Sequence, residues 1–269
     1  MISQVIGLAK EFSLNITSIE AKLFFPWSRL QPGILPIFPW IFKNDLDSLS
    51  RPDFIISCGR KSVYVSIYLK KKYKNIKNIH IQNPKINFKY FDYIIAPKHD
   101  NISGKNVISS IGAIHKFKDR KFNEVINQDF KIPTNNLISI IVGGNNNHYK
   151  FTLKEANDLI MKIKNIKIIN SNFNLITIFS RRTSQEVKDK LSYELKKISL
   201  ISDQFSKNTY SFALKNSIFF VVTSDSTSMV SECAFTKKPI YVYHLPFKRK
   251  SERIIRFHDL FEKLEITKK

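Results

Sequence analysis

Hydroxyl and carboxylate side chains gather in residues 222–232, directly after the apolar run 218–222. The apolar run is typical of a buried parallel strand, and a helix-compatible stretch follows it as far as Phe235. Backbone N–H groups at the start of such a helix, together with side-chain oxygens, can hold a phosphate or a sugar. We therefore take this corner as a candidate binding site, formed by Thr223, Asp225, Ser226, Ser228 and Glu232.

The two acids of this corner have separate expected roles. Asp225 can orient the loop through backbone N–H groups, and the alternative is an ordinary helix N-cap placed one residue early. Glu232 lies one to two turns into the helix, where it can accept hydrogen bonds from ribose hydroxyls.

Two further loops carry groups suited to an anion. Gly143 and Gly144 end the apolar run 137–142, where glycine permits positive φ and lets a ligand approach the backbone. Asn145 adds amide donors and acceptors there. Paired guanidinium groups can clamp a diphosphate. The next predicted strand ends in a loop with two of them, formed by Ser180, Arg181, Arg182 and Thr183. Taken alone, a Gly-Gly turn is more often just a turn, and the arginine loop is equally well a capped helix start with two surface arginines.

Strand-like and helix-like runs alternate along the chain. Strands are predicted at 53–57, 79–82, 93–96, 137–142, 175–179, 218–223 and 240–243, and helices at 3–12, 60–73, 153–164, 184–197, 226–236 and 253–264. Such alternation specifies an α/β fold with parallel sheets and helices on both faces. Loops that follow parallel strands meet at one sheet edge, so we expect the three loops to form a single site for an anionic nucleotide or nucleotide-sugar.

Pro133 and the polar residues after it separate two apolar stretches of the chain, and a new predicted strand follows at once. This polar break predicts two Rossmann-like domains, residues 1–131 and 132–269. The second is a complete doubly wound unit. The first opens on a helix, without the strand and glycine turn with which such a domain ordinarily begins.

The first half offers a possible general base and a second anion-binding turn. His99 beside Asp100, and His115 after a Gly-Ala turn, are candidates to deprotonate an acceptor, although loop histidines often serve only as structural hydrogen-bond partners. Gly59 and Arg60 form a strand-to-helix turn that can hold an anion or simply begin a helix. None of the other histidines has metal-ligand spacing, so no metal or cofactor is expected.

The chain carries a formal charge of +22 over 269 residues, and 43% of its residues are hydrophobic. Such a charge suits nucleic acid or an anionic membrane, but the lysines are scattered and no nucleic-acid motif is present, so specific nucleic-acid binding is not expected. Only two cysteines occur, Cys58 and Cys233, and they indicate a reducing compartment.

Residues 23–42 are the closest approach to a membrane segment. They contain both tryptophans, but prolines and Arg29 break the run. Core packing is the favoured interpretation, and a loop that dips into a bilayer surface is the alternative. With no signal-peptide pattern at the start, a cytoplasmic protein is expected, with peripheral attachment to the inner membrane left open.

A series of short motifs resembles the mitochondrial fission Elm family, which includes plant "elongated mitochondria" proteins and many bacterial relatives. The similarity spans nearly the whole chain. Its motifs are Pro52-Asp53, Ile56-Ser57, Gly59-Arg60, Gln82 and Pro84, Pro97, His99-Asp100, Asn106-Val107, Gly112-Ala113, His115, Gly143-Gly144, Ser180-Arg181-Arg182-Thr183, Thr223, Asp225-Ser226, Ser228-Met229 and Ser231-Glu232.

The resemblance implies a B-type glycosyltransferase fold, two Rossmann-like domains facing across a cleft with the nucleotide held by the second. It places Met229 with the donor-binding residues. Plant members look like peripheral adaptors, whereas bacterial members resemble nucleotide-sugar enzymes, and this chain looks more like the bacterial kind. The family's opening strand and its glycine-bearing loop are expected to be missing before Met1. The tail after Leu264 is short, so the final helix that crosses back to the first domain is expected to be absent.

These observations together predict a metal-independent glycosyltransferase-like protein. A nucleoside-diphosphate sugar is the expected donor, and a membrane lipid or an envelope glycan is the expected acceptor. The alternative is a non-catalytic peripheral membrane adaptor. The base, the sugar, the acceptor, any protein partner and the oligomeric state are not specified by the sequence.

Overall fold

The computed structural model describes residues 2–12, 15–115, 133–202 and 207–268. The chain divides into two compact units, residues 1–116 and 117–269. The domain boundary predicted between residues 131 and 132 lies outside the described residues.

The first unit is built on a four-stranded parallel sheet with strand order β1-β2-β3-β4. Its strands are β1 (Phe54–Cys58), β2 (Lys77–Ile81), β3 (Tyr93–Pro97) and β4 (Val107–Ser110), and its helices are α1 (Ile2–Glu11) and α2 (Arg60–Lys72), with short 3-10 turns at η1 (Pro39–Ile41), η2 (Phe88–Tyr90) and η3 (Lys98–Asp100). Helix α2 buries Val63 and Ile67 against β3 and Tyr64 and Leu69 against the segment before β1. Both faces of α2 are therefore used for packing.

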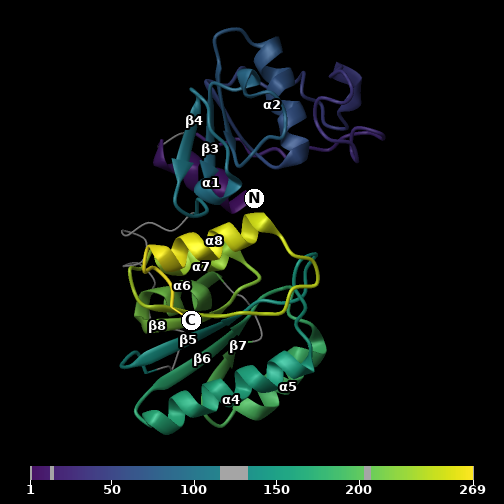
Figure 1. The fold of residues 1–269 in the computed structure, drawn as a ribbon. Helices are drawn as coiled ribbons and strands as arrows, with labels where there is room; N and C mark the ends of the chain where they lie inside the picture. Colours follow the sequence, from purple (N-terminus) through teal and green to yellow (C-terminus); the bar gives the residue numbers. More distant parts are fainter. Residues whose placement is uncertain (1, 13–14, 116–132, 203–206, 269) are drawn as a thin grey trace. The chain divides into compact units, whose positions relative to one another are not determined.

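The second unit is a five-stranded parallel sheet with strand order β7-β6-β5-β8-β9. Its strands are β5 (Leu137–Val142), β6 (Asn174–Phe179), β7 (Ser199–Ser202), β8 (Ser217–Thr223) and β9 (Ile240–Tyr243), and its helices are α4 (Leu153–Ile169), α5 (Gln185–Leu195), α6 (Lys207–Asn216), α7 (Thr227–Ala234) and α8 (Glu252–Lys263). Figure 1 shows α4 and α5 on one face of this sheet and α6, α7 and α8 on the other.

Strand β5 lies at the centre of this sheet and is buried along its whole length. Because side chains alternate between the two faces of a strand, Ile138, Ile140 and Val142 belong to the core under α4 and α5. Ile141 belongs instead to the core under α6, α7 and α8. The continuous apolar run of β5 thus serves two cores, as is usual for a parallel sheet covered on both sides.

The predicted elements agree with the structure except at some boundaries, and the structure adds strand β4, which is not among the predicted strands. Helix α4 continues to Ile169, five residues past its predicted end, because it buries Ile163 and carries Ile166 against the same core. The segment 23–42 divides between core and surface. Leu23, Trp27, Ile41 and Phe42 are buried, whereas the aromatic residues Phe24, Phe25, Phe38 and Trp40 are exposed.

Two buried histidines make the stability of the fold depend on pH. Burial lowers the pKa of His80 and of His258 from 6.5 to about 4. His80 Nδ1 lies 2.8 Å from Ser57 Oγ in the first unit, and His258 Nε2 lies 3.0 Å from the Ser224 carbonyl in the second. Each ring is therefore held neutral, and its contribution to stability is complete above the unfolded pKa of about 6.5 and is lost as the pH falls toward 4.

We expect the free energy of unfolding to fall by about 2 kcal/mol per histidine between pH 7 and pH 5, because only the unfolded state takes up the proton. Urea unfolding of the protein and of its His80→Gln and His258→Gln variants at both pH values measures this. The variants should show a shallower pH dependence than the parent chain. An unchanged slope in both variants would show that neither ring is responsible.

Candidate functional site

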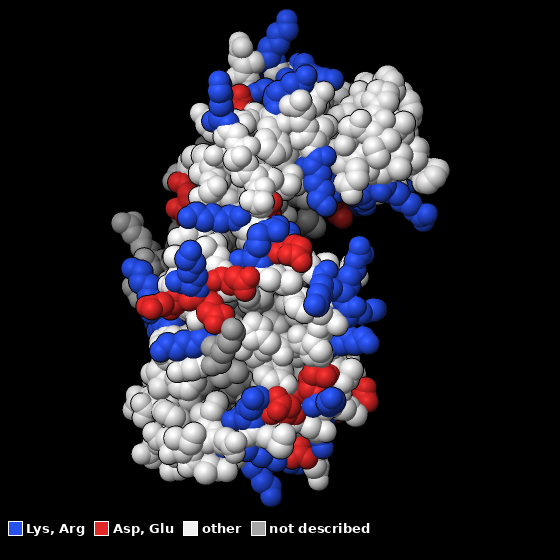
Figure 2. Space-filling view, in the orientation of Figure 1, with Lys and Arg blue, Asp and Glu red and all other residues white. Residues whose placement is uncertain are grey.

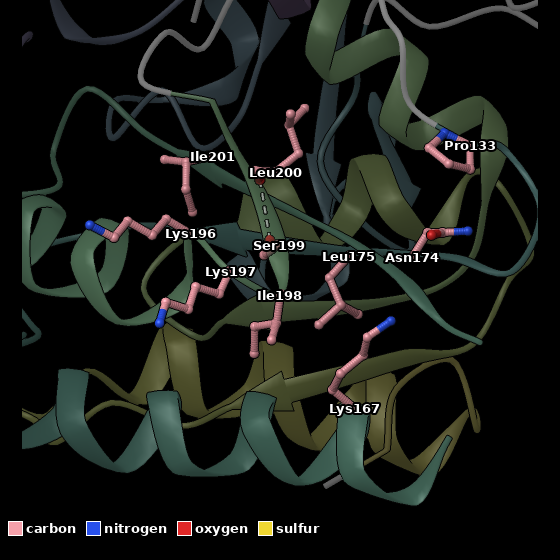
Figure 3. A pocket seen from close by; sticks show the side chains of 10 residues that line it. All are labelled: Pro133, Lys167, Asn174, Leu175, Lys196, Lys197, Ile198, Ser199, Leu200 and Ile201. Carbon is pink, nitrogen blue, oxygen red and sulfur yellow. Dashed lines mark hydrogen bonds between the residues drawn. The ribbon is translucent and has the colours of Figure 1, made fainter. Parts of the chain in front are cut away.

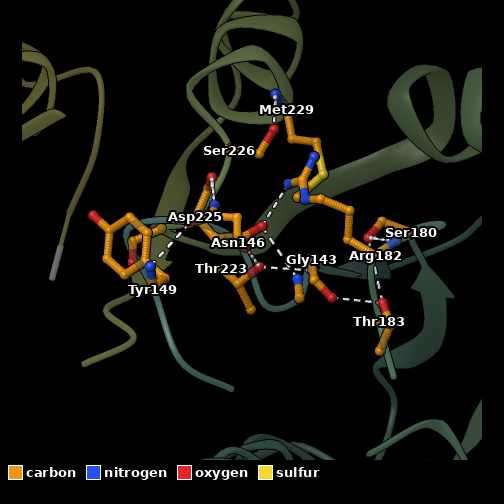
Figure 4. Close-up of polar contacts among 12 residues, drawn as sticks. Gly143, Asn146, Tyr149, Ser180, Arg182, Thr183, Thr223, Asp225, Ser226 and Met229 are labelled. Carbon is orange, nitrogen blue, oxygen red and sulfur yellow. Dashed lines mark hydrogen bonds and ion pairs between the residues drawn. The ribbon is translucent and has the colours of Figure 1, made fainter. Parts of the chain in front are cut away.

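The loops after β5, β6 and β8 meet at the carboxyl edge of the second sheet, where their backbones and side chains bond one another (Figure 4). Gly143 N donates to Thr223 Oγ1 at 2.7 Å, which joins the β5 loop to the end of β8. Thr183 Oγ1 donates to the Gly143 carbonyl at 2.5 Å, which joins the β6 loop to the β5 loop. Three segments far apart in sequence thus form one polar corner.

Asp225 is the centre of this corner, and its side chain is fully buried. Its Oδ2 accepts from Gly144 N at 3.1 Å and from Arg182 Nη2 at 2.5 Å, and its Oδ1 accepts from Thr223 Oγ1 at 2.6 Å. The carboxylate therefore holds all three loops together. Of the two predicted roles, the structure matches the orienting one, because Ser226 is the N-cap of α7.

The two glycines are required by close packing and not by backbone conformation. Neither Gly143 nor Gly144 has a positive φ, so the conformational reason predicted for them is wrong. A Cβ on Gly143 would lie 1.9 Å from Asp225 Oδ1, and a Cβ on Gly144 would lie 2.0 Å from the Arg182 carbonyl oxygen. No real Cβ tolerates such distances, so the approach of the other two loops excludes any side chain here.

The asparagines after the glycines hold their own loop in shape. Asn145 Oδ1 accepts from Phe151 N at 2.7 Å. The amide oxygen that was predicted to face a ligand therefore bonds the backbone of its own loop. Asn146 Oδ1 accepts from the N–H groups of His148 and Tyr149, while its Nδ2 donates to the Asp225 carbonyl at 3.0 Å. The sequence did not single out Asn146, although an Asn two residues before a turn is a typical Asx pattern.

The start of α7 carries the hydroxyls predicted for phosphate. Ser226 accepts from Met229 N, and Ser228 is exposed in the first turn. Met229 itself is buried in the core beneath the helix, so its side chain is not available to a ligand, contrary to the expectation from the family resemblance. What α7 can offer at this edge is therefore a helix N-terminus with its partial positive charge and one exposed hydroxyl.

One guanidinium group, that of Arg182, lies beside that helix start. The Arg182 side chain is 43% exposed while it pairs with the buried Asp225, the residue before the N-cap of α7. Arg181 is exposed. The buried carboxylate fixes one edge of the Arg182 guanidinium, and the remaining N–H donors are left for a second acceptor. Ser180 supports the loop, because its Oγ accepts from Arg182 N at 3.2 Å.

Glu232 lies farther along α7, where it contacts the protein itself. Its Oε2 accepts from Tyr210 Oη at 2.8 Å, a bond that ties α7 to α6. Burial, together with the charge of Glu232, holds the pKa of the Tyr210 hydroxyl well above its usual value, so the phenol stays a donor. A ribose hydroxyl would have to compete with this phenol for the carboxylate.

Arg60 in the first unit has a structural role that the sequence did not reveal. Its guanidinium donates to the carbonyls of Trp27, Ser28 and Leu30, and Gly59 is the N-cap of α2 with φ 93°. Of the two predicted roles of this turn, the structure matches the start of a helix, because Arg60 Nη1 and Nη2 bond carbonyls of a loop thirty residues earlier. Gly59 serves the backbone geometry of the turn.

The predicted general bases of the first unit lie away from its surface. The side chains of His99 and Asp100 are only 1% and 3% exposed, and they lie 3.8 Å apart. Asp100 Oδ2 also accepts from Asn83 N at 3.2 Å, so this acid supports the loop after β2. His115 is half-buried, and burial lowers the pKa of its ring. These contacts give His99 and Asp100 a packing role. The His115 side chain is still partly exposed to solvent.

Within the described residues, no group of three or more histidine, cysteine or acidic side chains is arranged to hold a metal ion. Over the same residues, no helix is both long enough and apolar enough to cross a bilayer.

A hollow of about 470 Å³ lies at the other edge of the second sheet (Figure 3). It is lined at the amino ends of β6 and β7 by Pro133, Lys167, Asn174, Leu175, Lys196, Lys197, Ile198, Ser199, Leu200 and Ile201. The Lys167 amine already donates to the carbonyls of Ser171 and Phe173, both at 2.5 Å. Since parallel strands direct their amino ends to the opposite edge from their carboxyl ends, this hollow is separate from the polar corner.

Comparison with known proteins gives the same family over the whole chain. The family model described as "Mitochondrial fission ELM1" matches residues 1–269. An uncharacterized protein of Rickettsia prowazekii is 28% identical to this chain, with 90% of the chain and 80% of that protein aligned. The mitochondrial fission protein ELM1 of Arabidopsis thaliana is 23% identical over 71% of this chain. That match covers 51% of the plant protein, so the chain spans about half of its length.

Solved structures confirm the fold. A putative UDP-N-acetylglucosamine 2-epimerase from Listeria monocytogenes aligns with a TM-score of 0.51 at 12% identity, covering 80% of this chain and 67% of that one. The S. aureus MnaA, solved with UDP, also gives a TM-score of 0.51 at 12% identity, covering 80% of this chain and 69% of that one. The predicted pair of Rossmann-like α/β domains is thus confirmed, as is the family prediction.

Proposed function

The chain belongs to the mitochondrial fission ELM1 family, and we propose that its second unit binds the diphosphate of a nucleotide-sugar at the carboxyl edge of the sheet, for glycosyl transfer. The observation that carries this proposal is the convergence of three loops on Asp225, which fixes Arg182 beside the N-terminus of α7. Arg181, Arg182 and Ser228 would contact the phosphates, and Glu232 would contact the ribose.

The electrostatics of the corner support a diphosphate ligand. The helix N-terminus and the Arg182 guanidinium supply positive charge, and Arg181 is exposed on the same loop, whereas the carboxylate of Asp225 is buried. These groups can neutralise a leaving diphosphate without a metal ion. The solved proteins of the same fold include one bound to UDP, and this supports a uridine nucleotide as the first probe.

The acceptor is the less constrained half of the proposal. We propose a membrane lipid or an envelope glycan as the acceptor. Two rival functions are tested beside it. Sugar-nucleotide epimerisation is suggested by the name of the Listeria protein, and a non-catalytic membrane adaptor is the alternative that the family resemblance implies.

Isothermal titration with UDP, GDP, CDP and UDP-N-acetylglucosamine tests the binding step. We expect micromolar binding of at least one of them, and a loss of roughly tenfold or more in Arg182→Ala, because a charge-assisted hydrogen bond is removed. Arg181→Ala is the cleaner variant, since that exposed side chain leaves no buried partner behind. Lys162→Ala on α4 removes an equal charge from an exposed site in the same unit and should bind normally.

The outcomes separate the three functions. If none of the nucleotides binds, the result contradicts the proposal and favours the adaptor. Nucleotide binding followed by release of free sugar or of an epimer from the donor alone favours the epimerase. Donor consumption that requires an added glycan or lipid acceptor supports the transferase.

A further inference from the structure

The segment 24–43 exposes an unusual number of large apolar side chains. Phe25 is 73% exposed, Ile34 61% and Trp40 61%, and Phe24 and Phe38 are also exposed. The Phe38 and Trp40 rings stack at 5.4 Å, and Trp40 meets the buried Trp27 edge-on at 5.0 Å, so Phe38, Trp40 and Trp27 form one cluster of rings. Exposed apolar clusters of this kind mark interaction surfaces.

The charge around this cluster follows a simple pattern. Residues 30–42 contain no charged side chain, and the two charged residues that bound them, Arg29 and Lys43, are both basic and exposed. The Lys43 amine lies 5.1 Å from the centre of the exposed Phe24 ring. In Figure 2 the surface beyond α2, where Figure 1 draws this segment, is largely uncharged, with Lys and Arg and some acidic side chains along its border.

The segment is held firmly from the side of α2. Arg60 donates to the carbonyls of Trp27, Ser28 and Leu30, Tyr64 Oη donates to the Gln31 carbonyl at 3.0 Å, and Trp27 Nε1 donates to the Pro36 carbonyl at 2.9 Å. These bonds satisfy backbone carbonyls of the segment within the protein, and an unpaired carbonyl is costly beside an apolar partner. The aromatic rings are thus displayed on a rigid support.

We propose that the segment 24–43 is a membrane-docking surface that inserts Phe25, Ile34 and Trp40 into the interface of an anionic bilayer. Aromatic and aliphatic side chains favour the boundary between headgroups and acyl chains, and lysine and arginine beside them attract anionic lipid. In residues 1–115, lysine and arginine outnumber aspartate and glutamate sixteen to seven, so the rest of the unit adds to this attraction.

The same distribution of charge disfavours a second copy of this chain and a nucleic acid as partners of this surface. In a symmetric pair of chains the identical surface meets itself, which would bring the basic flanks Arg29 and Lys43 toward their own copies. A nucleic acid needs cations along its path, and residues 30–42 offer none. This surface lies in the first unit, so the proposal stands whether or not the second unit binds a nucleotide.

Flotation with vesicles tests the proposal with the full chain. We expect binding to vesicles of phosphatidylcholine with phosphatidylglycerol, and much weaker binding to phosphatidylcholine alone. Phe25→Ser with Ile34→Ser should weaken binding roughly tenfold or more, because two apolar side chains no longer enter the interface. Lys43→Gln should weaken it by about fivefold. Ile168→Ser with Ile169→Ser, which changes two side chains on α4 that are 78% and 82% exposed, is the matched control and should bind normally.

Tryptophan fluorescence distinguishes insertion from adsorption by charge. Trp40 is exposed and Trp27 is buried, so a blue shift and quenching by brominated acyl chains on adding vesicles would report Trp40. The proposal is overturned if the Phe25 and Ile34 double variant binds vesicles as tightly as the parent chain, or if Trp40 is not quenched. Either result would indicate that the protein adsorbs to the membrane by charge alone. If the parent chain is a dimer without lipid and the double variant is a monomer, the surface binds a second copy of the chain and the membrane proposal is overturned.

Discussion

Replacing Gly144 with alanine will lower the free energy of unfolding of the second unit by about 3 kcal/mol or more. The added Cβ would lie 2.0 Å from the Arg182 carbonyl oxygen and 2.7 Å from Thr183 N. Both are backbone atoms, so no side-chain rotation can relieve the overlap. The β6 loop must move away, and that displacement strains the bonds from Thr183 to Gly143 and from Arg182 to Asp225.

Chemical denaturation followed by circular dichroism measures this loss, and hydrogen exchange shows where it acts. Protection should fall first in the loops after β5 and β6 and leave the first unit unchanged. Gly104→Ala is the control, because the nearest atoms to its added Cβ are side-chain atoms at 3.2 Å or more. A Gly144→Ala protein as stable as the Gly104→Ala protein would mean that the two loops do not approach as the structure shows.

The sequence predicted this corner well because its signals were local. An apolar run followed by hydroxyls and a helix-compatible stretch predicted the end of β8 and the start of α7 within one residue. The parallel order of the strands then required the loops to share an edge. The purpose of Gly143 and Gly144 was not predictable in the same way, because it depends on what lies opposite them, forty or eighty residues away.

The first unit shows the same limit more strongly. Arg60 looked like an anion ligand because it follows a strand, but its partners are carbonyls in a loop before β1. His99 and Asp100 looked accessible because they follow β3, yet both are buried. In residues 23–42, sequence alone favoured core packing throughout. Exposure of Phe25 and Trp40 beside buried Ile41 follows from an irregular backbone that no simple periodicity describes.

Removing the Asp225 carboxylate is the second large effect that we expect, and it can be divided into two parts. In Asp225→Ala, Gly144 N, Thr223 Oγ1 and Arg182 all lose their acceptor. Two of these donors are buried, so we expect a loss of about 3 kcal/mol in the free energy of unfolding. In Asp225→Asn the amide oxygen can still accept from Gly144 and Arg182, and the amide nitrogen can donate to Thr223 Oγ1. We expect this variant to lose only about 1 kcal/mol.

The same pair of variants connects stability to binding. In Asp225→Asn, Arg182 keeps its position but loses its counter-ion, so the corner gains one net positive charge. If the corner binds a diphosphate, UDP should bind this less stable protein at least as tightly as the parent chain, whereas Asp225→Ala should bind it poorly because the loops are no longer tied. Asp189→Ala, which removes an exposed acid on α5, should change neither quantity appreciably. Equal stability of Asp225→Ala and the parent chain would show that the buried carboxylate does not hold the three loops together.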